Sequence, residues 1–146
     1  MCSSDLPLIG WVAASGTTAP GGWTLFWILF VWQLPHFFAL SWCFKDDYRN
    51  AGIKMLSGLG DGGRAVMTQI LMFSLILIPI SLTPSVVGIA GRIYFFSALG
   101  LSVLFFGLCV RLAWTRHRSD AWLVFWSSIG YLPLIFSVLL LDRIPA

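Results

Sequence analysis

The chain is 146 residues long, 58% hydrophobic and only 10% charged, with a formal net charge of +3. Soluble domains carry about 25% charged residues, so this composition excludes a water-soluble fold and favours a protein whose solvent is lipid. We expect no nucleic-acid partner. The three cysteines, which lack C-x-x-C spacing, indicate neither a disulfide framework nor a zinc site: Cys2, Cys43 and Cys109.

The first apolar stretch, residues 6–14, is too short to cross a bilayer, which takes about 20 residues. It is predicted to be either an interfacial segment or the last turns of a helix. Residues 17–22, TTAPGG, then form a predicted turn. Four longer apolar stretches follow and predict an all-α, polytopic membrane helix bundle in a single domain over residues 1–146; the predicted spans are residues 23–43, 66–90, 93–114 and 121–141.

Prolines and small residues mark particular places within these spans. Pro79 and Pro84 should kink or end the second span near one membrane face. Small residues in the third and fourth spans favour close helix packing: Gly100, Gly107, Ser127, Ser128 and Gly130.

The basic residues gather in alternate connections, which predicts the orientation of the chain. The 44–65 loop holds Lys45, Arg49, Lys54 and Arg64, whereas residues 1–22 hold no Lys or Arg. Arg111, Arg116 and Arg118 mark the connection before the fourth span. Because cytoplasmic loops carry excess Lys and Arg, loops 44–65 and 112–120 are predicted to be cytoplasmic and the C-terminus outside, with the chain in the inner (plasma) membrane.

The run WQLPHFFALSW, residues 32–42, places polar groups inside the first span. Ionisable residues within membranes usually face a cavity or the bundle interior, and Pro35 leaves a carbonyl without its helical partner. Gln33 and His36 are therefore either the polar lining of a substrate cavity or part of a kink that neighbouring helices satisfy. If the helix continues through Phe44, His36 and Asp47 share one face, about 16 Å apart along the axis.

The sequence KDDYRN follows directly and forms a polar cluster. Asp46 and Asp47 offer the hard oxygen ligands that Mg²⁺ prefers, and Mg²⁺ is often bound by one or two carboxylates together with substrate phosphates. Lys45, Arg49 and Lys54 suit phosphate oxygens. The alternative is a solvated loop whose charges only fix the topology.

Two motifs connect these features to a known family. The pattern WQLPHF-x-AL-x-W, followed by DY-x-x-AGI-x-ML and the closing YLPLIFSVLLLD, resembles the protoheme IX farnesyltransferases (haem O synthases), which are UbiA-type intramembrane prenyltransferases. The resemblance covers most of the chain, from about Pro7 to Asp142.

The resemblance implies a nine-helix bundle, of which this chain would supply the last four helices and the end of the fifth. It implies transfer of a farnesyl group from farnesyl diphosphate to a vinyl group of haem b, which is a substrate and not a cofactor, to give haem O. Mg²⁺ would assist diphosphate departure, and haem A synthase is a candidate partner. The implied catalytic and metal-binding residues are Asp46 and Asp47, and the implied substrate-binding residues are Gln33, His36, Lys45, Tyr48, Arg49 and Lys54.

The chain departs from the family pattern in ways that matter for activity. The first polar motif, an Asn/Asp-rich stretch followed by arginines, belongs to a half that is absent here, so the chain alone is predicted to be inactive. At the D-x-x-x-D spacing of related enzymes, Asp46 meets Asn50. Phe44, Lys54 and Ser57 stand where Tyr, Pro and Pro are expected. The alternatives are a haem-binding membrane subunit with His36 as axial ligand, and a transporter-like bundle, both without transferase activity.

Overall fold

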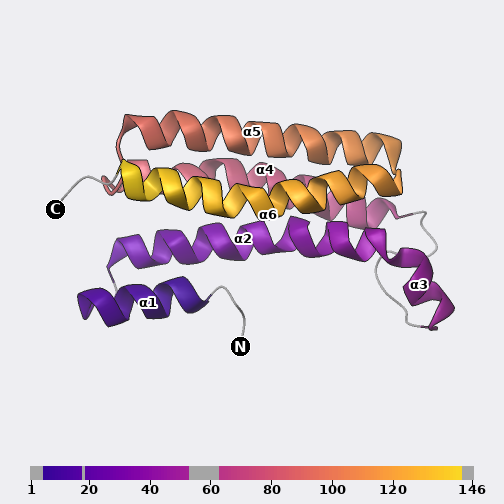
Figure 1. Ribbon diagram of the computed structural model, residues 1–146, viewed down its shortest axis with the longest axis horizontal. Coiled ribbons are helices and arrows are strands. Elements are labelled where there is room, and N and C mark those ends of the chain that lie inside the picture. Colours follow the sequence, from indigo (N-terminus) through magenta and orange to yellow (C-terminus); the bar gives the residue numbers. More distant parts are fainter. Residues whose placement is uncertain (1–4, 18, 53–62, 143–146) are drawn as a thin grey trace.

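The computed structural model describes residues 5–17, 19–52 and 63–142, and its regular elements are helices (Figure 1). Two of them are short, α1 (Asp5–Ser15) and α3 (Lys45–Asn50). The four long helices are α2 (Pro20–Cys43), α4 (Arg64–Val86), α5 (Arg92–Thr115) and α6 (Arg118–Leu141). With 23 or 24 residues each, all four are long and apolar enough to cross a membrane. The predicted all-α membrane bundle with four spans is confirmed.

Two predicted boundaries are wrong. The predicted turn at residues 17–22 is too long, because α2 already begins at Pro20, a residue whose fixed φ suits the first helical position. The second span, predicted to reach residue 90, ends at Val86. Gly88 has φ of +82°, and the amides of Ile89 and Ala90 both donate to the carbonyl of Pro84, so an apolar turn replaces the last helical turn.

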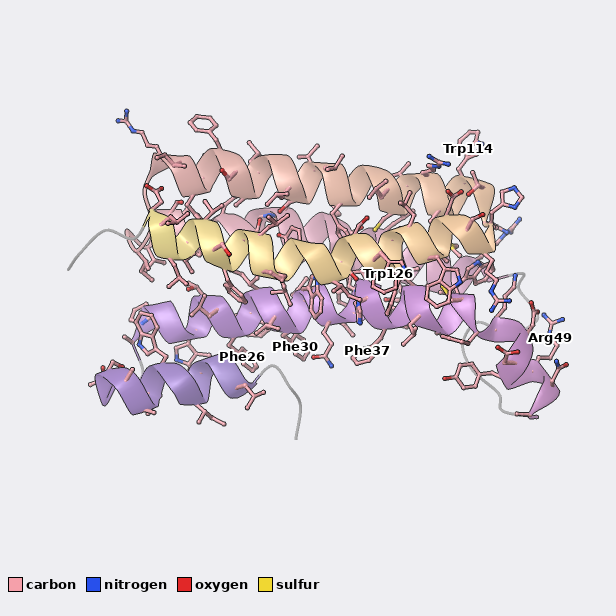
Figure 2. All side chains as sticks on the ribbon, viewed as in Figure 1. Phe26, Phe30, Phe37, Arg49, Trp114 and Trp126 are labelled. Atoms are coloured by element: carbon pink, nitrogen blue, oxygen red, sulfur yellow. The ribbon has the colours of Figure 1, made fainter. Side chains whose placement is uncertain are left out.

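The four long helices pack in a ring in which α2 contacts α4, α4 contacts α5, α5 contacts α6 and α6 returns to α2. Only 22–33% of the apolar window of each span is buried, so most of each helix surface faces outwards. The outward surface carries large apolar side chains, including Phe30, Phe37, Trp114 and Trp126 (Figure 2). Such a surface suits lipid or further helices and not water.

One end of the bundle is where α2 and α5 finish and α4 and α6 begin; we call it the α3 end (Figure 1). The connections predicted to be cytoplasmic both lie at this end. The indole N–H of Trp42 joins them by donating to the carbonyl of Arg116 over 3.3 Å. The shared end agrees with the charge pattern, while its assignment to the cytoplasm stays a prediction.

Buried hydroxyl groups connect α4, α5 and α6 inside the bundle. Ser102 of α5 lies between Ser81 of α4, at 2.8 Å, and the Tyr131 hydroxyl of α6, at 2.9 Å. The Tyr94 hydroxyl donates to the carbonyl of Ser81 over 2.8 Å. Hydrogen bonds of this kind hold helices together where lipid removes the hydrophobic driving force.

The α5–α6 hairpin is fastened at both ends by carboxylates of α6 or its cap. The Asp142 carboxylate accepts the backbone N–H of Tyr94 over 2.7 Å, in the first turn of α5. At the α3 end, Asp120 pairs with Arg111 at 3.1 Å and accepts a hydrogen bond from Thr115. Asp142 ends the motif YLPLIFSVLLLD, so the last residue of that motif has a structural role at the helix terminus.

The short helix α1 packs against α2 through Trp11. The indole lies on Gly21 and Gly22, where a Cβ would meet it at about 2.6–3.1 Å, so glycine is required for this approach. The prediction that residues 6–14 do not span is confirmed by the 11-residue length of α1. Among the residues described, the Trp11 indole nitrogen is the single fully buried side-chain polar atom without a hydrogen-bond partner.

Candidate functional site

The polar cluster KDDYRN forms the separate helix α3, and α2 does not continue into it. The chain breaks at Phe44, whose φ and ψ are −102° and 14°. In Figure 1, α3 turns away from the axis of α2 at the end of the bundle. The prediction of one continuous helix that carries His36 and Asp47 on the same face is therefore wrong. Cys43, which that face would have included, is 2% exposed and belongs to the core.

Aromatic contacts fix the break at Phe44. The Phe44 ring meets Trp122 of α6 edge to face, with centroids 5.7 Å apart. Trp42, which is 4% exposed, bonds to Arg116, and its indole also carries the ammonium of Lys45 over its ring at 4.1 Å. A cation over an indole face is attracted by the negative centre of the ring. These contacts hold the start of α3 against the α5–α6 connection.

Gly63, at the start of α4, closes the other side of this region. Its φ is +80°, a left-handed conformation that glycine adopts without steric cost. A Cβ at this position would overlap the indole of Trp42. The glycine therefore allows the chain to return directly over Trp42 as α4 begins.

Three of the four charged side chains of α3 are exposed, and the fourth, Lys45, lies over Trp42. Asp46 and Asp47 lie in the first turn of α3 and are exposed. Arg49 approaches Asp46 at 3.9 Å, but both side chains are more than half exposed, so the pair contributes little to stability. Figure 2 shows Arg49 at the extreme end of the molecule. Two carboxylates and two cations are thus available to a ligand at the membrane surface.

The second part of the site lies in the middle of α2 and faces α6. The His36 ring is stacked between Trp32 and Phe125, with centroids 4.9 Å away on each side. Its Nδ1 lies 2.6 Å from the hydroxyl oxygen of Ser128. The Trp32 indole N–H donates to the carbonyl of Ser128 over 3.0 Å. His36 is half-buried.

The structure thus divides the predicted site residues into two groups. Lys45, Asp46, Asp47, Tyr48 and Arg49 are together on α3. Gln33 and His36 are both half-buried in the interior of α2. Lys54 lies outside the described residues, as does Ser57.

Sequence reasoning missed the contribution of α6. Ser128 was expected only to allow close helix packing, yet its hydroxyl contacts His36 across 92 residues of sequence. Phe125 and Trp122 also contact the two parts of the site. The sequence does show Ser128 three positions after Phe125, which puts both on one side of the fourth span. It does not show which helix that side faces.

Four helices that are long and apolar enough to cross a membrane define the class as a polytopic membrane protein, and α3 carries acidic and basic side chains at one end of the bundle. The chain belongs to the UbiA prenyltransferase family, whose model matches residues 4–130.

The chain is also similar to individual curated proteins of known name. The chain is 43% identical over 137 residues to the protoheme IX farnesyltransferase of Solibacter usitatus, covering 94% of this chain and 47% of the relative. It is 39% identical over 144 residues to the protein of the same name from Koribacter versatilis, covering 94% of this chain and 46% of that one. A third, from Cupriavidus metallidurans, is 42% identical over 139 residues, with 94% and 45% covered. The chain spans about half the length of these relatives. No solved structure matches it.

Proposed function

We propose that this chain is the C-terminal half of an enzyme that transfers a farnesyl group from farnesyl diphosphate to a vinyl group of haem b, giving haem O. The observation that carries the proposal is similarity over 94% of the chain to relatives named protoheme IX farnesyltransferase. In this proposal, residues 1–146 form part of one membrane domain whose remaining helices pack against the outward apolar surface. The haem pathway then makes haem A synthase a proposed partner, because it would consume haem O.

Helix α3 supplies the groups for the diphosphate end of the reaction. When the bond between farnesyl carbon and diphosphate oxygen breaks, positive charge develops on carbon and negative charge on the leaving oxygens. Lys45 and Arg49 are placed to bind these oxygens at the membrane surface, and such preorganised charges lower the energy of the charge-separated state. Because Lys45 rests on Trp42, its ammonium is held near the start of α3.

The donor set of α3 fits a magnesium ion that arrives with diphosphate. Asp46 and Asp47 are exposed and adjacent, whereas the described residues contain no group of three His, Cys, Asp or Glu side chains that could hold a metal alone. Mg²⁺ is commonly bound by one or two carboxylates plus phosphates, which matches this arrangement. Asp46 and Asp47 would hold the ion, and the ion would neutralise charge on the departing diphosphate.

His36 and the residues around it are the proposed binding site for haem b. This site lies within the span, away from the charged α3 end, where a flat apolar ring system would be stabilised. The alternative of a haem-binding subunit with two histidine ligands is not favoured, because His117 is exposed at the cap of α6. We place the α3 end in the cytoplasm and the C-terminus outside, in the inner membrane, on the strength of the basic residues at the α3 end.

The test uses a chimaera in which the N-terminal half of the Solibacter usitatus relative precedes this chain. It is expressed in a bacterium whose own haem O synthase has been deleted, and extracted haems are separated by chromatography and weighed by mass spectrometry. We expect haem O to appear. The Asp47→Ala variant should abolish it without changing the amount of protein in the membrane, and Asn50→Ala, on the same short helix, should not.

A second chimaera with the Koribacter versatilis C-terminal half controls for the junction. Haem O from that chimaera but none from the first, at equal membrane levels, would contradict the proposed function. Full activity of the Asp47→Ala variant would remove Asp47 from the diphosphate site while leaving the reaction assigned.

A further inference from the structure

The hydroxyl of Ser128 has two close neighbours, and together they determine where its proton lies. Its oxygen is 2.6 Å from the carbonyl oxygen of Phe125, to which it donates, and 2.6 Å from Nδ1 of His36. Ser128 is 0% exposed, so water does not share these bonds. The Trp32 indole N–H donates to the backbone carbonyl of Ser128, so α2 and α6 are held together at this position.

A serine hydroxyl has one hydrogen to donate and two lone pairs to accept with. Two oxygens at 2.6 Å need a hydrogen between them, and the Phe125 carbonyl has none, so the serine hydrogen lies on that side. The short contact with His36 then needs its hydrogen from the imidazole. Neutral His36 is therefore the tautomer with hydrogen on Nδ1, and its lone pair is on Nε2.

The surroundings of the ring leave Nε2 as its binding atom. Trp32 and Phe125 cover the two faces of the imidazole, and Phe37 meets it at 66° with centroids 5.7 Å apart, so a ligand could approach only along the ring edge. Among the residues described, Nε2 of His36 has no hydrogen-bond partner. It is also not fully buried, because the Trp11 indole nitrogen is the single fully buried and unpartnered side-chain atom in that part of the chain. An unpartnered lone pair on an oriented imidazole is the arrangement that metal-binding histidines show.

We propose that Ser128 is a positioning residue that holds His36 as the Nδ1–H tautomer and so presents Nε2 to the iron of the haem substrate. The identity of the metal ligand rests on the proposed function, but the tautomer does not. An iron bound to Nε2 would lie beside the α2–α6 interface, within the long apolar helices.

The first measurement is nitrogen NMR of histidine-labelled chain in lipid vesicles. The chain contains two histidines, so His117→Asn, which puts a good capping residue at the start of α6, leaves His36 as the only signal. We expect the protonated nitrogen to be Nδ1. In the Ser128→Ala background the two tautomers should mix. The control is Ser127→Ala, whose side chain lies in the α5–α6 groove with Tyr131 and not at His36.

The second measurement is an optical titration of the same vesicles with ferric haem. We expect the spectrum of nitrogen-ligated iron in the His117→Asn chain, and its loss in His36→Ala. Removing a group that orients a metal-ligating histidine weakens metal binding by about 10- to 100-fold, so Ser128→Ala should raise the haem dissociation constant by about that factor. Ser127→Ala should leave it unchanged.

Specific outcomes would overturn the inference. A proton found on Nε2, or an unaltered tautomer in Ser128→Ala, would remove Ser128 as the group that orients the ring. Haem ligation that survives His36→Ala, or no ligation by any variant, would remove iron as the ligand of Nε2. By contrast, a chimaera that makes no haem O while both measurements succeed would refute the proposed function, and with it haem as a substrate, but would leave the Nδ1–H tautomer and the ligation of haem iron by His36 in place.

Discussion

Ser102→Ala is expected to loosen the packing of three helices at once. The Ser102 hydroxyl is 1% exposed and bonds to Ser81 on α4 and to Tyr131 on α6. Alanine removes both bonds, and the gain in helix propensity that it brings is shared by any other Ser→Ala change within α5. The Tyr131 hydroxyl, on a side chain only 3% exposed, would lose its Ser102 partner.

The size of the effect follows from the number of interhelical bonds lost. Such bonds contribute about 0.6 kcal/mol on average in membranes, with a maximum near 1.7 kcal/mol. Losing two should therefore lower the free energy of unfolding by about 1.2 kcal/mol, and by no more than about 3.4 kcal/mol. Tyr131→Phe removes one bond and should cost about 0.6 kcal/mol. Adding Tyr131→Phe to Ser102→Ala should cost almost nothing further, because the shared bond is already gone.

Reversible unfolding in mixed micelles, followed by far-ultraviolet circular dichroism as the share of denaturing detergent rises, measures these changes. The matched control is Ser97→Ala, on the same helix, which has no side-chain hydrogen bond among the described residues. A Ser102→Ala chain as stable as the control would refute the reasoning. Strictly additive losses in the double variant would show that Ser102 and Tyr131 do not share a bond.

The remaining predictions concern the helix ends and the candidate site. Asp142→Ala should lower the free energy of unfolding by about 1 kcal/mol, because the Tyr94 amide loses its cap. Asp142→Asn should keep most of the stability, because the asparagine oxygen can still accept from that amide. Equal losses in the two variants would mean that only the charge of Asp142 matters. Gly63→Ala should cost about 1–3 kcal/mol, from the left-handed backbone and the overlap with Trp42, and a neutral result in the same assay would contradict that geometry. His36→Ala in the Solibacter chimaera should raise the KM for haem about 10-fold and leave the KM for farnesyl diphosphate unchanged; an equal rise in both would indicate a general structural role.

The spans were predictable because hydropathy can be read directly along the sequence, without knowing which helices are neighbours. A run of about 20 apolar residues must cross the bilayer as a helix, since only helices and barrels satisfy their backbone groups there. The end of α4 could also have been predicted from the sequence. Gly88 was a helix-stop signal that the apolar neighbours Val87 and Ile89 concealed, and its positive φ is what ends the segment.

The break at Phe44 was not predictable from local sequence. Neither Cys43 nor Phe44 is a helix-stopping residue, and the positions before and after them are helical. The chain turns there because Phe44 packs on Trp122 and Trp42 bonds to Arg116, which are contacts with residues more than 70 positions away. Tertiary packing of this kind overrides propensity and leaves no periodic trace.

The candidate site was predicted in composition but not in arrangement. Residue types predicted that Asp46 and Asp47 hold a metal with phosphate, which stays a prediction, and picked out His36 as the ionisable group inside the first span. Their separation onto two helices depends on the break at Phe44. The contact between His36 and Ser128 depends on which faces α2 and α6 turn towards each other, and that is decided by packing around the whole ring of helices.

The double fastening of the α5–α6 hairpin bears on how its two helices are held in the membrane. Arg111 lies near the end of α5 and is 63% exposed, so its charge can extend towards the membrane surface, and there it pairs with Asp120 of the following helix. Asp142 reaches the amide of Tyr94 only after α6 has crossed to the opposite face. Each fastening needs both helices, so α5 and α6 are expected to be more stable in a bilayer as a hairpin than singly.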